Sequence, residues 1–238
     1  MSPGMEINEI LSDEERRSSF LSSVRQALGH NVNAASPAPD TRPILSERLL
    51  RQVEADSPQI ISRWIEKARG NGMTVVEASV DGAATPAIEF LTSHRARTVM
   101  VNFSANPAPG IEGKLAAAGY TLRHWGDSDC MQQAFNCDAS ITDCRYGMAD
   151  SGGFLVWSDR NFGRSTTLTT AVHIVLLPKR LIVADLIDAM PKILSDNNGL
   201  MPSNAVVING PSKTGDIEMK LVTGVHGPKY LCAILLGD

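Results

Sequence analysis

The chain has 238 residues, 43% hydrophobic and 20% charged, a composition typical of a soluble globular protein with one large α/β domain or a domain plus an appended segment. Its 22 lysine and arginine residues against 26 acidic residues give a net charge of −4, which disfavours nucleic-acid binding. No apolar run approaches the roughly 20 residues of a membrane span, and the N-terminus lacks the apolar core of a secretory signal. We therefore expect a cytoplasmic protein, without a membrane partner, whose four cysteines are reduced thiols.

The first 42 residues differ in character from the rest of the chain. Residues 13–28 carry apolar positions at helical spacing, with Gly29 as a C-cap, and predict an amphipathic helix. Residues 31–43 are rich in Ala, Pro, Ser and Asn, a composition that predicts a linker. We expect residues 1–42 to form a helical arm that docks on the main domain or on a partner chain, or that only solubilises the protein. Whether the chain forms a homo-oligomer is left open.

From residue 43 to residue 238 the pattern predicts a single α/β domain. In its first half, helical and extended periodicities alternate, which indicates a Rossmann-like, mostly parallel sheet flanked by helices. The expected helices are 49–68, 85–94, 111–118 and 129–135, and the expected strands are 73–78, 98–102 and 120–125.

The second half predicts a mixed sheet. The apolar segments 139–142 and 153–157 are separated by too few residues for a crossover helix, so a hairpin between them is expected. Further strands are expected at 172–177, 205–208 and 231–236, with a helix at 181–194. The last strand should lie in the interior of the sheet.

The C-terminal stretch 204–228, NAVVINGPSKTGDIEMKLVTGVHGP, is a candidate binding site. A buried strand runs through a turn at Gly210 into a short helix, for which Ser212 and Thr214 are candidate N-caps and Asp216 stands in the first turn. Such helix starts bind anions, although an ordinary capped turn explains the same pattern. One element later a second turn follows, with candidate residues Gly224, His226 and Gly227.

Two further stretches could carry chemistry. The segment DCRYGMADSGG offers the carboxylate of Asp150 and the turn residues Ser151, Gly152 and Gly153, or an Asx turn in which Asp150 caps its own backbone. In NFGRSTTLTTAVH, Arg164 precedes a run of hydroxyl side chains suited to a carboxylate or phosphate, and His173 opens a strand. A lone histidine in that position is more often a structural residue than a catalytic one.

The cysteines do not predict a cofactor. Cys130, Cys137 and Cys144 are seven residues apart, but the expected strand 139–142 interrupts any helix that would align them, and no C-x-x-C pair exists. Nucleotide-binding and catalytic-triad motifs are also missing from the sequence. We therefore expect no metal and no cofactor.

In order, the segments YGMADSGGFLVWSD, FGRSTTLTTAVHIVLLPK and INGPSKTGDIEMKLVTGVHGPKYLCAILLGD resemble the lactate utilization protein C family, the LUD domain. The pair GPSKTGDIE and GVHGP is the specific part, and the resemblance covers about residues 40–238. It implies the fold of glucosamine-6-phosphate deaminases, ribose-5-phosphate isomerases and CoA transferases. It also implies a role in bacterial L-lactate oxidation to pyruvate beside iron–sulfur partner proteins, which would carry the electrons.

Two positions depart from the family pattern. The family commonly has Ala-Glu-Thr-Gly-Thr where this chain has Ala-Asp-Ser-Gly-Gly at 149–153, and the usual Leu-Pro before His173 is absent. The carboxylate of Asp150 is one methylene shorter than that of a glutamate, which weakens a CoA-transferase assignment, since a misplacement of about 1 Å costs on the order of 100-fold.

Three functions follow as hypotheses. In the first, the chain is a subunit of a lactate-oxidation system that binds a small anion through Arg164, with Asp150 and His226 as acid or base groups. The second is a stand-alone isomerase or acyl-transfer enzyme acting on a sugar phosphate or CoA ester. The third is an assembly protein whose turns are structural.

Overall fold

The structure is a computed structural model that describes residues 13–27, 29, 57–159, 162–215 and 221–237. Two compact units divide the chain, Met1–Leu49 and Leu50–Asp238. In the first unit, helix α1 (Asp13–Ala27) confirms the expected N-terminal helix, and its apolar side chains Phe20, Leu21 and Val24 are exposed. The expected linker, and the first residues of the helix expected at 49–68, lie outside the described residues.

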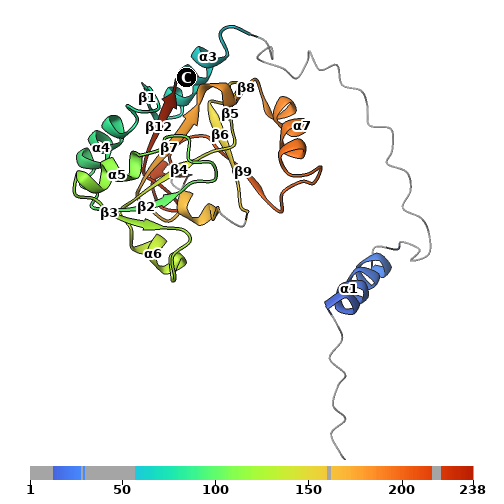
Figure 1. Cartoon of the computed structure of the whole chain (residues 1–238). Coiled ribbons are helices and arrows are strands. Elements are labelled where there is room, and N and C mark those ends of the chain that lie inside the picture. The colour runs from blue at the N-terminus through green and yellow to red at the C-terminus, as the bar shows by residue number, and fades with distance from the viewer. Residues whose placement is uncertain (1–12, 28, 30–56, 160–161, 216–220, 238) are drawn as a thin grey trace, which may run out of the picture. The chain divides into compact units, whose positions relative to one another are not determined.

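A six-stranded sheet organises the second unit (Figure 1). The strand order is β1-β12-β7-β4-β2-β3, and every neighbouring pair in it is parallel. The strands are β1 (Thr74–Ala78), β2 (Thr98–Asn102), β3 (Thr121–His124), β4 (Ala139–Asp143), β7 (Val172–Pro178) and β12 (Tyr230–Leu236). The C-terminal strand β12 lies inside the sheet, as expected, because its run of buried apolar residues needs cover on both faces.

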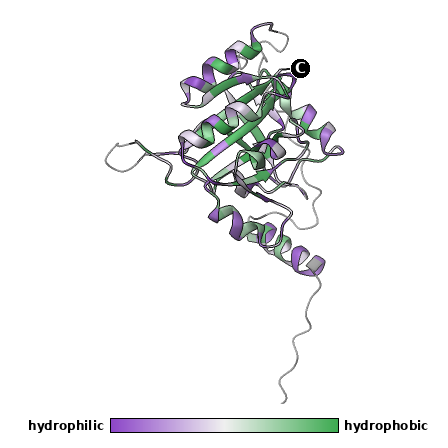
Figure 2. Ribbon diagram, turned by 60° about the vertical axis from the view of Figure 1, so that its left-hand side comes forward, coloured by the Kyte–Doolittle hydropathy of each residue, from purple (hydrophilic) through white to green (hydrophobic). Residues whose placement is uncertain are grey.

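One face of this sheet is covered by helices α4 (Ala84–Ser93) and α5 (Ile111–Ala117). Ala87 and Leu91 of α4, and Leu115 of α5, pack without exposure against Val99 and Ile141 of the sheet. Helix α6 (Cys130–Asn136) packs on the other face at the β3 end, where Ala134 meets Met100. Figure 2 shows the same division, with hydrophobic strands inside and hydrophilic residues on the outer surfaces of the helices.

The opposite face is covered by helix α3 (Ile60–Gly70) and by a second, four-stranded sheet of order β8-β5-β6-β9. Trp64 of α3 is fully buried there, and its Nε1 donates a hydrogen bond of 2.8 Å to the carbonyl of Gly153. Helix α7 (Leu186–Asp196) covers the outer face of the second sheet. The strands of this sheet are β5 (Tyr146–Met148), β6 (Gly153–Trp157), β8 (Ile182–Val183) and β9 (Ala205–Ile208).

The expected α/β class, with a mostly parallel sheet flanked by helices, is therefore confirmed, but the expected hairpin is wrong. Segment 139–142 belongs to β4 in the large sheet, whereas β6 pairs antiparallel with β5, a strand that the sequence did not predict. The helix expected at 181–194 begins later, at Leu186, because the carboxylate of Asp185 accepts the backbone N–H of Asp188 at 3.0 Å and caps it there.

The helix expected after Ser212 is also wrong. Residues Lys213–Gly215 form β10, which pairs antiparallel with β11 (Leu221–Thr223), and Thr214 lies opposite Val222. Ser212 and Thr214 therefore cap no helix, and Asp216 lies outside the described residues. The β-branched residues Thr214, Val222 and Thr223 favour the extended conformation over a helix this short. Among the described residues, none of the helices combines the length and the apolar character that a membrane span requires.

Candidate functional site

The turn from Asp150 to Gly153, between β5 and β6, is packed tightly against helix α3. Gly152 has a φ of +69°, and a Cβ added to it would lie 2.3 Å from the backbone nitrogen of Ala68. Its N–H donates to the carbonyl of Met148 at 2.8 Å, and the N–H of Asp150 donates to the carbonyl of Ala184 at 2.9 Å. These two N–H groups are thus used within the fold. One carboxylate oxygen of Asp150, Oδ1, is buried and has no hydrogen-bond partner.

Asn71, at the end of α3, joins this first turn to the turn at Gly210. Its Nδ2 donates a bond of 2.7 Å to the carbonyl of Ser151. Its own carbonyl lies 2.8 Å from where a Cβ of Gly210 would stand, and accepts a bond of 2.8 Å from Nζ of Lys213. The turn at Gly210, with φ of +114°, therefore needs glycine.

The third turn, Gly224 to Pro228, is held directly by Ser212. The N–H of Ser212 donates to the carbonyl of Pro228, and the N–H of Gly224 donates to the carbonyl of Ser212, both at 2.9 Å. A Cβ added to Gly227 would lie 3.2 Å from the Cβ of Ser212. The three turns singled out in the sequence thus form one connected group, Asp150–Gly153 to Asn71 to Gly210–Ser212 to Gly224–Pro228.

A cavity of about 550 Å³, here called the turn pocket, opens beside the third turn. It lies at the amino ends of β7 and β12, where Ala171 directly precedes β7 and the third turn leads into β12. His226 is exposed in it, and the buried hydroxyl of Thr169 has no hydrogen-bond partner. Its lining comes from the third turn and from the hydroxyl-rich segment after Arg164: Ser165, Leu168, Thr169, Thr170, Ala171, Gly224, Val225, His226 and Gly227, with Phe135 of α6.

Arg164 and His173 occupy different surroundings. Arg164 is exposed and begins a short 3₁₀ helix, η1 (Arg164–Thr167), one residue before Ser165 of the turn pocket. His173 lies fully buried in β7, where its Nε2 is 2.9 Å from the hydroxyl of Thr142 and its ring stands edge-on to Phe154. Burial lowers the pKa of His173 to about 3, so the ring is neutral at physiological pH.

The sequence-predicted residues are therefore only partly assembled. Gly224, His226 and Gly227 line the turn pocket and Ser212 supports it, whereas Asp150, Arg164 and His173 are outside its lining. Two residues of the turn group were missed, Asn71 and Lys213. The Gly70-Asn71-Gly72 helix end and the lysine inside Gly-Pro-Ser-Lys-Thr were the available signals. Among the described residues, no group of three or more His, Cys, Asp or Glu side chains could hold a metal ion.

Comparisons with known proteins assign the chain to a family. The family model of the LUD domain matches residues 54–236, a range that contains all three turns. The chain belongs to the LUD domain family. A DUF162 family protein from Deinococcus radiodurans has the same fold as this LUD domain, with a TM-score of 0.55 at 17% identity, over 75% of this chain and 97% of that one.

Curated relatives of this LUD protein from several bacteria carry the name Lactate utilization protein C. The protein from Halalkalibacterium halodurans is 28% identical over 230 residues, which cover 94% of this chain and 99% of the relative. The protein from Shouchella clausii is 36% identical over 118 residues, 48% of this chain and 52% of the relative. The match to the second thus spans about half of its length, while the match to the first runs through the whole LUD domain.

Proposed function

We propose that this LUD protein is a cytoplasmic subunit of a bacterial system that oxidises L-lactate to pyruvate, in which iron–sulfur partner proteins carry the electrons. The observation that carries the proposal is the match to Lactate utilization protein C of Halalkalibacterium halodurans, which extends over 99% of that protein. The part assigned to this chain is binding of a small carboxylate or phosphate.

The turn pocket is the proposed binding site. Its lining has hydroxyl groups from Ser165 and Thr169 and the imidazole of His226, all groups that can donate hydrogen bonds to an anion. Thr169 supports this assignment, since its buried hydroxyl has no partner within the described protein. A volume of about 550 Å³ accommodates a small carboxylate with its bound water, or a larger phosphorylated compound.

Arg164 is proposed to hold the carboxylate or phosphate at the mouth of this pocket. It is exposed, it precedes a pocket residue, and a guanidinium binds such groups in bidentate fashion. His226 is the proposed acid or base inside the pocket. Asp150 is outside the lining, so it would act only on a ligand that also reached the first turn. Glycines Gly152, Gly153 and Gly210 serve the packing of the turns.

The experiment is complementation of a bacterium that cannot grow on L-lactate because it lacks its own lactate utilization protein C. The full chain should restore growth, and Arg164→Ala and His226→Ala should each reduce it. Lys192→Ala is the matched control for Arg164→Ala, since it removes one exposed positive charge on α7. Growth that neither site variant reduces would contradict the assignment of the turn pocket.

The alternative, a stand-alone enzyme, has its own test. The purified chain should be inert toward sugar phosphates and CoA esters if the proposal is correct. Turnover of either class that is lost in Asp150→Ala would instead support an isomerase or acyl-transfer enzyme. The unpartnered Oδ1 of Asp150 is the observation that keeps this alternative in view.

A further inference from the structure

The turn pocket is much larger than the small anion proposed for it. Its volume of about 550 Å³ lies within the range of about 300–1,000 Å³ that holds drug-sized ligands. L-lactate takes up the space of roughly four water molecules, about 120 Å³ in total. A lactate bound to Thr169 and His226 would therefore leave most of the pocket to water or to a further part of the ligand.

The rest of the lining carries large apolar side chains. Phe135, Leu168 and Val225 all line the pocket, and they are 63%, 49% and 52% exposed. They come from three different elements, which are helix α6, the segment after η1 and the third turn. Helix α6 is held beside η1, where the hydroxyl of Ser165 lies 3.7 Å from Sδ of Met131. Apolar side chains scattered singly over a surface need no explanation, but three around one cavity form a patch typical of a binding site.

The polar and apolar parts of the lining together select a class of ligand. Hydrogen-bond donors come from Ser165, Thr169 and His226, and none of the described residues in the lining is acidic, so the pocket suits a carboxylate. The apolar side chains lose contact with water only if the same ligand has an apolar part. Removal of about 60 Å² of apolar surface from water tightens binding roughly tenfold, a gain for which the methyl group of lactate is too small.

We propose that the turn pocket binds a carboxylate with a bulky apolar side chain, of about the size of a phenyl or isobutyl group, in preference to L-lactate. The inference rests on the proposed function, since the same polar groups would hold the carboxylate. It adds Phe135, Leu168 and Val225 as the residues that determine specificity. A 2-hydroxy acid with such a side chain keeps the hydroxyl and carboxylate groups of lactate and fills the apolar part of the pocket.

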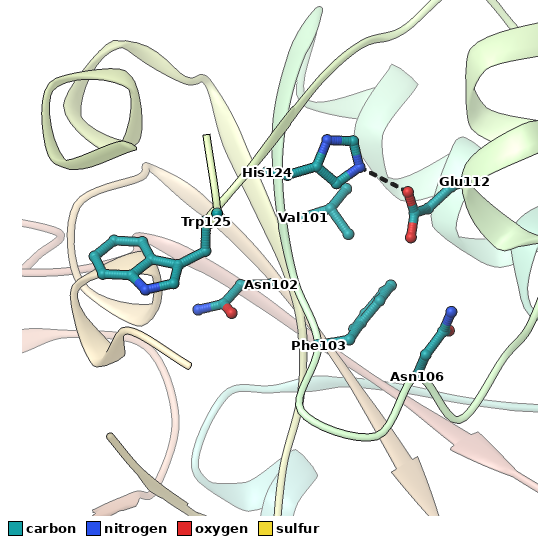
Figure 3. Close-up of a pocket in the computed structure, with 8 residues that line it drawn as sticks. Val101, Asn102, Phe103, Asn106, Glu112, His124 and Trp125 are labelled. Atoms are coloured by element: carbon teal, nitrogen blue, oxygen red, sulfur yellow. Dashed lines mark hydrogen bonds and ion pairs between the residues drawn. The ribbon is translucent and has the colours of Figure 1, made fainter. Parts of the chain in front are cut away.

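Another cavity, of about 260 Å³, lies at the carboxyl ends of β2 and β3 and has a different character. Figure 3 shows Glu112 and His124 side by side in it, with Oε2 of Glu112 2.7 Å from Nε2 of His124. Because a carboxylate already lies in this cavity, it disfavours a second one. Glu112→Gln removes that negative charge, so it tests whether a bound carboxylate occupies this cavity instead of the turn pocket.

The test is calorimetric titration of the full chain with 3-phenyl-L-lactate and, separately, with L-lactate. We expect phenyllactate to bind at least about tenfold more tightly, with dissociation constants of roughly 0.1–1 mM against roughly 1–10 mM. Phe135→Ala and Leu168→Ala should each reduce the ratio of the two constants by about threefold, since each removes part of the apolar lining. Both side chains are exposed, so their truncation leaves the core intact.

Leu200→Ala is the matched control for Leu168→Ala. Leu200 follows α7, is 68% exposed and lies outside the lining of the turn pocket, so its truncation should leave the ratio unchanged. Glu112→Gln should also leave the ratio unchanged. A preference for phenyllactate that is altered in Glu112→Gln and retained in both turn-pocket variants would overturn the proposal, because the apolar side chain would then lie in the other cavity.

Tighter binding of phenyllactate that Phe135→Ala and Leu168→Ala reduce, and that both controls retain, supports the proposal. Equal affinity for the two acids would overturn it, and the anion site would still stand if His226→Ala weakened the binding of L-lactate. Saturable binding of phenyllactate without binding of L-lactate would support this inference and contradict lactate as the ligand. If neither acid saturates the chain at roughly 100 mM, ten times the upper expected constant, both the inference and the proposed anion site are overturned.

Discussion

The packing of the Asp150–Gly153 turn on α3 can be tested by adding one methyl group. In Gly152→Ala the new Cβ would lie 2.3 Å from the backbone nitrogen of Ala68 and 2.5 Å from the carbonyl carbon of Lys67. Both are backbone atoms, so relief requires the turn to move away from the helix. A positive φ costs an alanine about 1–2 kcal/mol, and overpacking of this kind costs about 1–3 kcal/mol more.

Part of this cost is offset, since alanine loses about 0.4–1 kcal/mol less backbone entropy on folding than glycine does. The free energy of unfolding should therefore fall by about 2–4 kcal/mol. With a urea dependence of roughly 1–3 kcal/mol per molar, the unfolding midpoint should shift down by about 1–2 M. Urea unfolding followed by circular dichroism measures this shift directly.

Gly110→Ala separates the two contributions. Gly110 also has a positive φ, +86°, but a Cβ added there would meet nothing within 4 Å. This control should lose only about 1 kcal/mol, the conformational part of the cost. If Gly152→Ala is no more destabilising than Gly110→Ala, the turn does not press on α3 and the account of the first turn is refuted.

Three further predictions concern single contacts. Burial lowers the pKa of His173 to about 3, below its unfolded value near 6.5, so the free energy of unfolding should be highest above about pH 6.5 and fall by up to about 1.4 kcal/mol per pH unit below it. Urea unfolding at pH 7.5 and 5.5 measures this fall, and an equal fall in His173→Gln would refute the prediction. The hydroxyl of Tyr146 donates a hydrogen bond to the carboxylate of Asp196 and connects β5 to α7, so Tyr146→Phe should lower the free energy of unfolding by about 1–2 kcal/mol in the same assay. An unchanged unfolding midpoint would show that the contact does not stabilise the fold. Asn71→Ala should lower the free energy of unfolding by about 1–2 kcal/mol, since it leaves the carbonyl of Ser151 without its donor, and it should raise the rate of amide hydrogen exchange in the 149–153 turn. Unaltered exchange in this turn would contradict the role given to Asn71.

Much of the fold could be predicted from periodicity, because apolar runs and their spacing depend on burial alone. Strands 98–102, 153–157 and 205–208 have the bounds that the sequence predicted. The pairing of strands could not be predicted from periodicity. Strand β6 is close to β4 in sequence but pairs with β5 and β9, and its first residue, Gly153, accepts a hydrogen bond from Trp64, which is distant in sequence.

The wrong prediction of a helix after Ser212 has a local cause. Hydroxyl residues followed by acidic ones fit a helix start, and the same residues also fit an extended strand, so local preference did not separate the two. The grouping of the three turns depended on Asn71, which belongs to a helix end far away in sequence. The turn motifs themselves were visible in the sequence, but their mutual contacts required the folded chain.

The turn pocket illustrates the same limit. His226, Gly224 and Gly227 were picked out by their turn, and they line a pocket together. Thr169 also lines this pocket but was not predicted, because single hydroxyl side chains are common along the chain. Only the burial of its hydroxyl without a hydrogen-bond partner sets it apart.

The most direct test of the proposed function is calorimetric titration of the full chain with L-lactate. We predict one saturable binding event that His226→Ala and Arg164→Ala each weaken by about tenfold, the loss of one good hydrogen bond or ion pair, while Lys192→Ala leaves it unchanged. L-lactate, pyruvate and inorganic phosphate should compete for this site. Absence of saturable heat with all three anions, or binding that neither site variant weakens, would contradict the proposal that the turn pocket binds a small anion.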